Sequence, residues 1–323
     1  MMDPRICVVG AGRLSSRRLY PYLGAAGAQL VGVCDMDSEK AQINARRFGG
    51  RAYTDMTEML DREQPDGVMI CIGPEQHAAL AAQVMRRGLP VYTEKPPAPS
   101  AAEARALMEI ARERPVLCMT AFKKRHATAY ARGKEWLGQF DPRDFSMLSI
   151  DYASGQYGNA TPQSSFLLDF AIHIIDLTQF LFGEVATVCA FAKGLDAYAV
   201  SLRFRNGAVG TLSLNDARSF AIPTEEVELS VTGGNFMSIH NSSCWKITEH
   251  GEAREWHEPM TFTSGGDSGN DTGHFAEIVD FISAVQEQRI TSRSSIEESY
   301  KSMVLYEAIV QSAETGRIVP VEF

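Results

Sequence analysis

An apolar segment near the start of the chain runs directly into two closely spaced glycines. Residues 6–9 are typical of a buried strand, Gly10 and Gly12 follow with one residue between them, and a helical pattern starts near Leu14. This order of strand, Gly-x-Gly turn and helix brings main-chain N–H groups to the phosphates of a dinucleotide. The third position of the motif is Ser15, where Gly or Ala is usual, so the motif alone is weak evidence.

A second apolar run, residues 28–34, ends at Asp35. An acid there, about 20 residues after the glycines, can bind the hydroxyls of the adenosine ribose. A carboxylate repels the 2'-phosphate of NADP, which favours NAD, but Arg13 leaves NADP open because it can pair with Asp35 or with that phosphate. The alternative is a plain glycine turn with Asp35 as the cap of a helix that starts near Ser38.

Up to residue 121, short apolar runs alternate with helical patterns. We expect strands at 5–10, 28–34, 51–53, 67–72, 90–93 and 116–120, and helices at 14–24, 38–48, 55–62, 75–87 and 100–113. Such alternation is typical of β-α-β units in an α/β fold. We therefore predict a dinucleotide-binding Rossmann domain, with a doubly wound parallel sheet, over residues 1–121.

Beyond residue 121 the pattern changes to a run of strands. We expect helices at 130–137 and 166–181, strands at 145–152, 185–191, 197–205, 208–214, 225–231, 236–240 and 245–248, a loop over 264–273, and closing helices at 274–286 and 297–315. Alternating apolar and polar residues indicate a sheet with one buried face. A C-terminal α+β domain with an open, mostly antiparallel sheet is predicted over 122–323.

Composition excludes several classes of protein. The 323 residues carry a formal net charge of -9, which gives no basic surface for a nucleic acid. No apolar run reaches the ~20 residues of a membrane span, and no signal peptide precedes the first strand, so we expect a cytoplasmic protein. The six cysteines include no C-x-x-C pair and the histidines have no ligand spacing, so we predict no metal site.

Open parallel sheets bind ligands beyond the carboxyl ends of their strands. Two loops of this kind are Gly73-Pro74-Glu75-Gln76-His77 and Glu94-Lys95-Pro96-Pro97. A lysine above a nicotinamide could donate a hydrogen bond to a substrate hydroxyl and stabilise negative charge as its proton leaves. The alternative is a surface lysine that pairs with Glu94.

Asp169 and His173 lie four residues apart in a largely apolar helical segment. Residues at this spacing share one face of a helix, and buried polar groups need partners. A histidine beside a carboxylate suits a general base that takes a proton from an alcohol. A structural Asp-His pair in the core is the alternative.

Taken together, these motifs resemble the Gfo/Idh/MocA family, named after glucose-fructose oxidoreductase, inositol dehydrogenase and a rhizopine-catabolism protein. The resemblance runs nearly end to end, and includes Ala121-Phe122-Lys123-Lys124-Arg125 and Ser312-Ala313-x-Thr315-Gly316-Arg317. It implies a nucleotide-binding domain joined to an α/β domain whose open sheet commonly forms the interface of a homodimer or homotetramer. It also implies oxidation or reduction of a secondary alcohol or ketone on a sugar, cyclitol or related polyol.

The same resemblance implies roles for individual residues. His173 would take the hydroxyl proton, Lys95 would polarise that oxygen, Asp169 would orient His173 or hold a neighbouring hydroxyl, and hydride would pass to NAD or NADP. The implied cofactor contacts are Gly10, Gly12, Arg13, Leu14, Asp35, Ile72, Gly73, Pro74, His77, Glu94, Lys95, Pro96 and Lys123.

The basic run Lys123-Lys124-Arg125-His126 departs from the common family pattern. It could bind an anionic substrate such as a sugar acid, contact cofactor phosphates, or be a solvated surface. Two other functions compete with a dehydrogenase on this fold: a non-catalytic sensor of NAD(P) or a sugar, and a glycosidase that uses NAD transiently.

Overall fold

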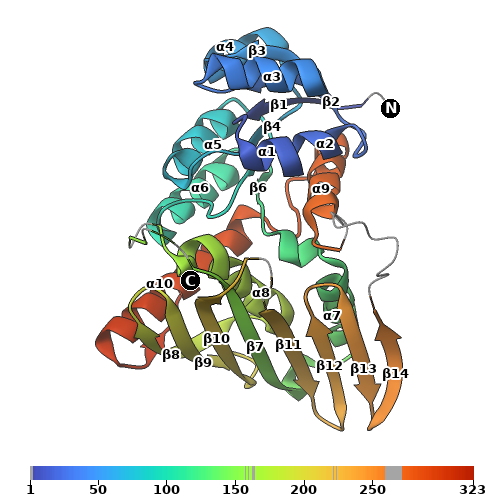
Figure 1. The fold of residues 1–323 in the computed structure, drawn as a ribbon, viewed down its shortest axis with the longest axis vertical. Coiled ribbons are helices and arrows are strands. Elements are labelled where there is room, and N and C mark those ends of the chain that lie inside the picture. The colour runs from blue at the N-terminus through green and yellow to red at the C-terminus, as the bar shows by residue number, and fades with distance from the viewer. Residues whose placement is uncertain are drawn as a thin grey trace. The chain divides into compact units, whose positions relative to one another are not determined.

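The computed structural model describes residues 3–156, 158, 160–161, 164–220, 222, 224–258 and 271–323. The chain divides into two compact units (Figure 1). The first comprises Met1–Phe122 with His274–Tyr300, and the second comprises Lys123–Gly273 with Lys301–Phe323.

The sheet of the first unit is parallel throughout its six strands. Its order is β3-β2-β1-β4-β5-β6, so the chain builds outward from β1 on one side and then returns to β4 on the other. A ligand crevice is expected beyond the carboxyl ends of β1 and β4, where the order reverses. The strands are β1 (Arg5–Val9), β2 (Gln29–Cys34), β3 (Arg51–Tyr53), β4 (Gly67–Ile70), β5 (Val91–Thr93) and β6 (Cys118–Thr120).

Helices follow each of these strands except the last, as the sequence predicts. Asp37, Asp55 and Ser100 cap three of them by accepting main-chain N–H groups. The elements are α1 (Arg13–Arg18), α2 (Tyr20–Leu23), α3 (Ser38–Phe48), α4 (Met56–Glu63), the 3-10 turn η1 (Pro74–Gln76), α5 (His77–Arg86) and α6 (Ala101–Glu113).

The helix predicted over 14–24 is interrupted. Leu19 leaves helical geometry between α1 and α2. Pro21 has no N–H to donate to the carbonyl of Arg17, and its ring crowds that carbonyl, so a continuous helix is not possible here.

Helix α9 (His274–Gln286) belongs to the first unit, although the sequence boundary after residue 121 places it in the second domain. The reason is its apolar face. Ile278, Phe281 and Ile282 are buried in the same core cluster as Ile6 and Val8 of β1. In Figure 1, α9 lies beside α2.

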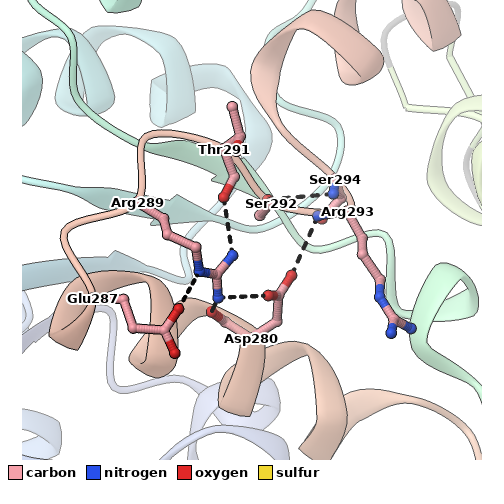
Figure 2. Close-up of polar contacts among 7 residues, drawn as sticks. All are labelled: Asp280, Glu287, Arg289, Thr291, Ser292, Arg293 and Ser294. Atoms are coloured by element: carbon pink, nitrogen blue, oxygen red, sulfur yellow. Dashed lines mark hydrogen bonds and ion pairs between the residues drawn. The ribbon is translucent and has the colours of Figure 1, made fainter.

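A polar cluster fixes the segment after α9 (Figure 2). The Arg289 guanidinium donates to Glu287 Oε2 at 2.7 Å and to Asp280 Oδ1 at 3.2 Å. Asp280 Oδ2 in turn accepts from the N–H of Arg293 at 3.3 Å. Ser294 O then accepts from the N–H of Thr120 at 2.9 Å, which ties the segment to β6.

The second unit contains a sheet of nine strands in the order β14-β13-β12-β11-β7-β10-β9-β8-β15. Adjacent strands of this sheet are antiparallel, except for β7 and β10, which are parallel to each other. The strands are β7 (Phe145–Gly155), β8 (Val185–Lys193), β9 (Ala197–Phe204), β10 (Val209–Arg218), β11 (Thr224–Val231), β12 (Asn235–His240), β13 (Cys244–Glu249), β14 (Glu252–His257) and β15 (Val319–Pro320).

One face of this sheet is buried by helices. Helix α8 packs on β7, and α7 packs on β12. The helices and helical turns that follow β6, apart from α9, are η2 (3-10, Lys123–His126), α7 (Thr128–Leu137), η3 (3-10, Pro142–Asp144), η4 (π-helical, Leu167–Ala171), α8 (Ile172–Phe182) and α10 (Ile296–Thr315). Of the loop expected over 264–273, residues 264–270 lie outside the described residues.

Candidate functional site

Gly10 ends β1 in a conformation that requires glycine. Its φ is 103°, and its N–H donates to the carbonyl of Cys34 at 2.7 Å. A Cβ at this position would overlap with the carbonyl oxygen of Cys71. The first glycine of the motif is therefore needed for the fold itself.

Gly12 has a different reason to be glycine. It precedes α1 with a φ of -77°, which any residue can adopt, and a Cβ here would meet no heavy atom within 4 Å. Gly12 lines an open cavity at the start of α1, where main-chain N–H groups lack partners inside the helix. The open space fits the close approach of a phosphate that a side chain would obstruct.

Ser15 replaces the third glycine without loss of packing. The residue is fully buried, and its hydroxyl donates to the carbonyl of Gly12 at 3.1 Å. The polar group is thus satisfied inside the turn, and the departure from the common motif costs little.

The cavity has a volume of about 600 Å³ and lies at the carboxyl edge of the sheet. Its walls come from the turns after β1, β2, β3 and β4, which is the crevice expected at the reversal of strand order. Seven of the predicted cofactor contacts line it: Gly10, Gly12, Arg13, Leu14, Asp35, Ile72 and Gly73. The remaining predicted contacts, Pro74, His77, Glu94, Lys95, Pro96 and Lys123, are not among its lining residues.

Asp35 connects the end of β2 to the glycine turn. Its Oδ2 accepts from the N–H of Ala11 at 2.7 Å, and its Oδ1 accepts from the N–H of Asp37 at 2.9 Å. Asp37, not Asp35, caps α3, by accepting from the N–H groups of Glu39 and Lys40. The interpretation of Asp35 as a helix cap is therefore wrong, and its carboxylate borders the cavity.

A second carboxylate, Asp55, borders the same cavity after β3. Burial of the Cys34 thiol raises its pKa to about 11, and the negative charges of Asp55 and then Asp35 contribute to this rise. Both carboxylates are therefore close enough to the end of β2 to act on the same group.

His77 is buried and links the loops that follow β4 and β5. Nδ1 lies 2.7 Å from the carbonyl oxygen of Pro96, and Nε2 lies 3.2 Å from that of Ile72. Burial lowers the pKa of this histidine, and the nearby charge of Lys95 acts in the same direction, although the two carbonyls oppose the shift. Ile72 lines the cavity, so His77 connects a residue of the cavity wall to the loop after β5.

Lys95 follows β5 in the loop that His77 holds. The N–H of Glu94 donates to the carbonyl of Ile70 at 2.9 Å, which continues the sheet by one residue. Lys95 comes next, is half-buried, and its main-chain N–H donates to Glu94 Oε2 at 3.3 Å.

In the second unit, Asp169 and His173 lie on either side of a change in helix type. Asp169 belongs to the π-helical turn η4, where the sequence predicts ordinary helix, and His173 lies in the first turn of α8. Asp169 Oδ2 accepts from the hydroxyl of Ser164 at 3.0 Å, and His173 is buried, with 9% of its surface exposed. Single π turns inside helices occur frequently at functional sites.

The basic run after residue 122 is largely buried, and its interpretation as a solvated surface is wrong for Lys124 and Arg125. Lys124 pairs with Glu225. Arg125 makes two hydrogen bonds of 2.8 Å to the carboxylate of Asp176. These two cations already have carboxylate partners within the second unit.

Asp176 has no role predicted from the sequence. It is fully buried on α8, one turn after His173, and also accepts from the hydroxyl of Ser302 at 2.8 Å. The sequence signal for Asp176 is its place in a largely apolar helix, since a buried carboxylate must be paired.

Comparison with known sequences identifies the family. The profile described as "Oxidoreductase family, NAD-binding Rossmann fold" matches residues 4–122, and its partner, the "C-terminal alpha/beta domain", matches residues 135–323. The chain belongs to the Gfo/Idh/MocA oxidoreductase family. As in that family, an NAD-binding Rossmann domain is followed by a C-terminal α/β domain.

Curated members of the Gfo/Idh/MocA family include sugar and cyclitol dehydrogenases. A D-apiose dehydrogenase of Paraburkholderia graminis is 30% identical over 72% of this chain and 69% of its own length. An inositol 2-dehydrogenase of Saccharopolyspora erythraea is 24% identical over 99% of this chain and 96% of its own length.

Solved structures share the fold. A levoglucosan dehydrogenase in complex with NADH and levoglucosan has a TM-score of 0.85 at 19% identity, with 99% of each chain covered. An oxidoreductase of Agrobacterium radiobacter in complex with NAD+, L-tartaric acid and magnesium also has a TM-score of 0.85, at 18% identity, with 99% of this chain and 98% of that chain covered.

In the part of the chain that the structure describes, none of the helices has both the length and the apolar character to span a bilayer. No group of His, Cys, Asp and Glu among these described residues is arranged to hold a metal ion.

Proposed function

We propose that this protein is an NAD-dependent dehydrogenase that transfers hydride between the coenzyme and a secondary alcohol or ketone of a sugar, cyclitol or related polyol. The observation that carries the proposal is the cavity at the end of β1, where Gly12 leaves space for phosphate and Asp35 presents a carboxylate. Membership of a family with apiose and inositol dehydrogenases supports the substrate class.

We assign the chemistry to Lys95, Asp169 and His173. In the oxidation, the imidazole of His173 accepts the proton of the substrate hydroxyl while the C–H bond of the same carbon breaks as hydride. Lys95 donates a hydrogen bond to the oxygen and stabilises its developing negative charge. Asp169 orients His173 or binds a neighbouring hydroxyl. The nicotinamide ring supplies the acceptor for the hydride.

We infer that the substrate is neutral. Lys124 and Arg125, two of the three cations that suggested an anionic substrate, are buried against Glu225 and Asp176. A buried cation that already has a carboxylate partner gives little additional attraction for a second anion. The inference predicts faster turnover of neutral polyols than of matched aldonates or sugar phosphates.

We also propose a homodimer or homotetramer that packs through the open face of the second sheet. Ser149, Thr211 and Ser201 lie side by side across β7, β10 and β9 on that face, beside exposed Val209 and Phe191. Small side chains and scattered apolar ones make a flat surface suited to a second copy. Thr211→Arg should reduce the molar mass measured by light scattering, and an unchanged mass would reject this interface.

We propose a cytoplasmic location, because all six cysteines are free thiols, four of them buried, and reduced thiols persist in that compartment.

The test of function is formation of NADH with a panel of inositols, aldoses and anhydrosugars. A dehydrogenase gives net NADH with at least one of them. A sensor binds NAD and a sugar but reduces no coenzyme, and a redox glycosidase cleaves a glycoside without net NADH. Either of these last results would replace the proposal.

A further inference from the structure

Asp35 and Asp55 follow adjacent parallel strands of the first unit. Cys34 at the end of β2 pairs with Tyr53 at the end of β3, and the N–H of Asp35 donates to the carbonyl of Tyr53 at 3.1 Å. Neighbouring strands lie about 4.8 Å apart, so Asp35, one residue after β2, and Asp55, two residues after β3, share one edge of the sheet. Both carboxylates border the same cavity.

The start of α4 holds Asp55 in place. Its Oδ1 accepts from the N–H of Glu58 at 2.7 Å, which makes it the N-cap of the helix. Asp55 is exposed and lines the cavity, and on the same helix Arg62 pairs with Glu58 at 2.9 Å. The fixed negative charge of Asp55 therefore faces whatever enters this end of the cavity.

We propose that Asp55 is a second coenzyme-selecting residue, which acts with Asp35 to exclude NADP. The proposal rests on the proposed function, because it requires that the cavity binds a nicotinamide coenzyme. The 2'-phosphate of NADP carries close to two negative charges at neutral pH, whereas the corresponding hydroxyl of NAD is neutral. Two carboxylates at one edge of the sheet repel the 2'-phosphate of NADP and leave the neutral hydroxyl of NAD unaffected.

The charge distribution of the cavity wall agrees with this proposal. Among its lining residues, all within the described part of the chain, three are acidic and one is basic: Asp35, Asp55 and Glu75 against Arg13. Arg13 alone does not balance these three carboxylates, so the cavity wall keeps a negative excess. Removal of the Asp55 charge halves this excess.

The test uses Asp55→Asn in the complete chain. Asparagine caps helices about as well as aspartate, so α4 keeps its N-cap while the charge is lost. We expect the ratio of Kd for NADP to Kd for NAD, measured by isothermal titration without substrate, to fall by roughly threefold to tenfold. The decrease should shrink when salt is added, because the repulsion is between partly exposed charges.

Glu58→Gln is the matched control. It removes one negative charge from the same helix turn, but Glu58 pairs with Arg62 and is not among the residues that line the cavity. Its ratio should equal that of the wild type.

An unchanged ratio in Asp55→Asn, or an equal change in Glu58→Gln, would overturn the assignment of Asp55 while leaving the dehydrogenase intact. Failure of the wild type to bind either coenzyme would reject the coenzyme site itself, and the role of Asp55 with it.

Discussion

Gly10 faces the carbonyl oxygen of Cys71 so closely that a β-carbon would overlap with it. This contact joins the ends of β1 and β4, which are also linked by the N–H of Cys71 donating to the carbonyl of Val9 at 2.8 Å. The contact and the cavity therefore share one turn, and the two glycines of the motif have separable roles.

Gly10→Ala should destabilise the first unit by roughly 2–4 kcal/mol, because φ is positive and the added methyl group has no room. Gly12→Ala should leave the melting temperature almost unchanged, since a Cβ there meets no protein atom. The same Gly12→Ala change should weaken NAD binding by on the order of tenfold, because the methyl group occupies the space of a phosphate. Thermal unfolding and NAD titration of both variants measure these effects; equal stability losses would contradict the separation of roles.

The stability of the first unit should depend on pH through His77. Burial lowers the pKa of His77 below the ordinary value of 6.5, so the unfolded chain binds a proton that the folded chain does not. The contribution of His77 is complete above the unfolded pKa and is lost progressively as the pH falls from there toward the folded pKa. Melting temperatures between roughly pH 8 and pH 5 should therefore fall less steeply for His77→Gln than for the wild type.

His250→Asn is the control for this pH dependence. His250 is exposed and has a φ of 52°, which asparagine tolerates. The slope of His77→Gln is compared with the slopes of this variant and of the wild type. A His77→Gln slope that matches the wild type would show that the folded chain does not favour the neutral ring.

Arg125→Met should destabilise the second unit by about 3–5 kcal/mol, because it leaves the buried carboxylate of Asp176 without its cation. The double variant Arg125→Met/Asp176→Leu should recover part of this loss, since no buried charge remains. Urea unfolding measures both. The exposed pair of Arg143 and Asp141 offers the comparison, and Arg143→Met should have no measurable effect. If the double variant is less stable than Arg125→Met, the loss in Arg125→Met does not come from the unpaired buried carboxylate, and the ion pair itself provides the stability.

Lys95→Ala should lower kcat by on the order of a hundredfold or more while the Kd for NAD changes little, because the lysine acts on the substrate oxygen. Lys40→Ala is the control. Lys40 is exposed on α3 and pairs with Asp37, the N-cap of that helix, so this variant should keep the wild-type kcat. Steady-state kinetics and coenzyme titration separate the two effects. A parallel loss of NAD affinity in Lys95→Ala would assign the lysine to coenzyme binding instead.

Local pattern predicted the elements well because apolar periodicity and caps are properties of neighbouring residues. The strands of the first unit follow from such signals. The caps at Asp37 and Asp55 are equally local, but Asp35 was the only one of these residues considered as a cap from the sequence. Strand β14 was not predicted, since Glu252–His257 contains no regular apolar alternation. The split of the first helix at Leu19 could have been found from Pro21.

Long-range contacts explain what the sequence could not predict. Lys124 meets Glu225 across 101 positions, and Arg125 meets Asp176 across 51, so their burial is invisible in a local run of basic residues. The same applies to α9. This helix follows the strands β7 to β14 in the sequence, yet its apolar face is buried in the core of the first unit. Such pairings become evident only when the fold brings distant segments together.

The proposed reaction transfers hydride from a substrate carbon to NAD. The most direct measurement uses the polyol on which the wild type is most active, labelled with deuterium at the carbon that is oxidised, and detects the label on the reduced coenzyme by mass spectrometry. We expect one deuterium in each NADH formed, and loss of this product in His173→Ala. The absence of NADH with every polyol tested, or NADH without deuterium, would contradict it.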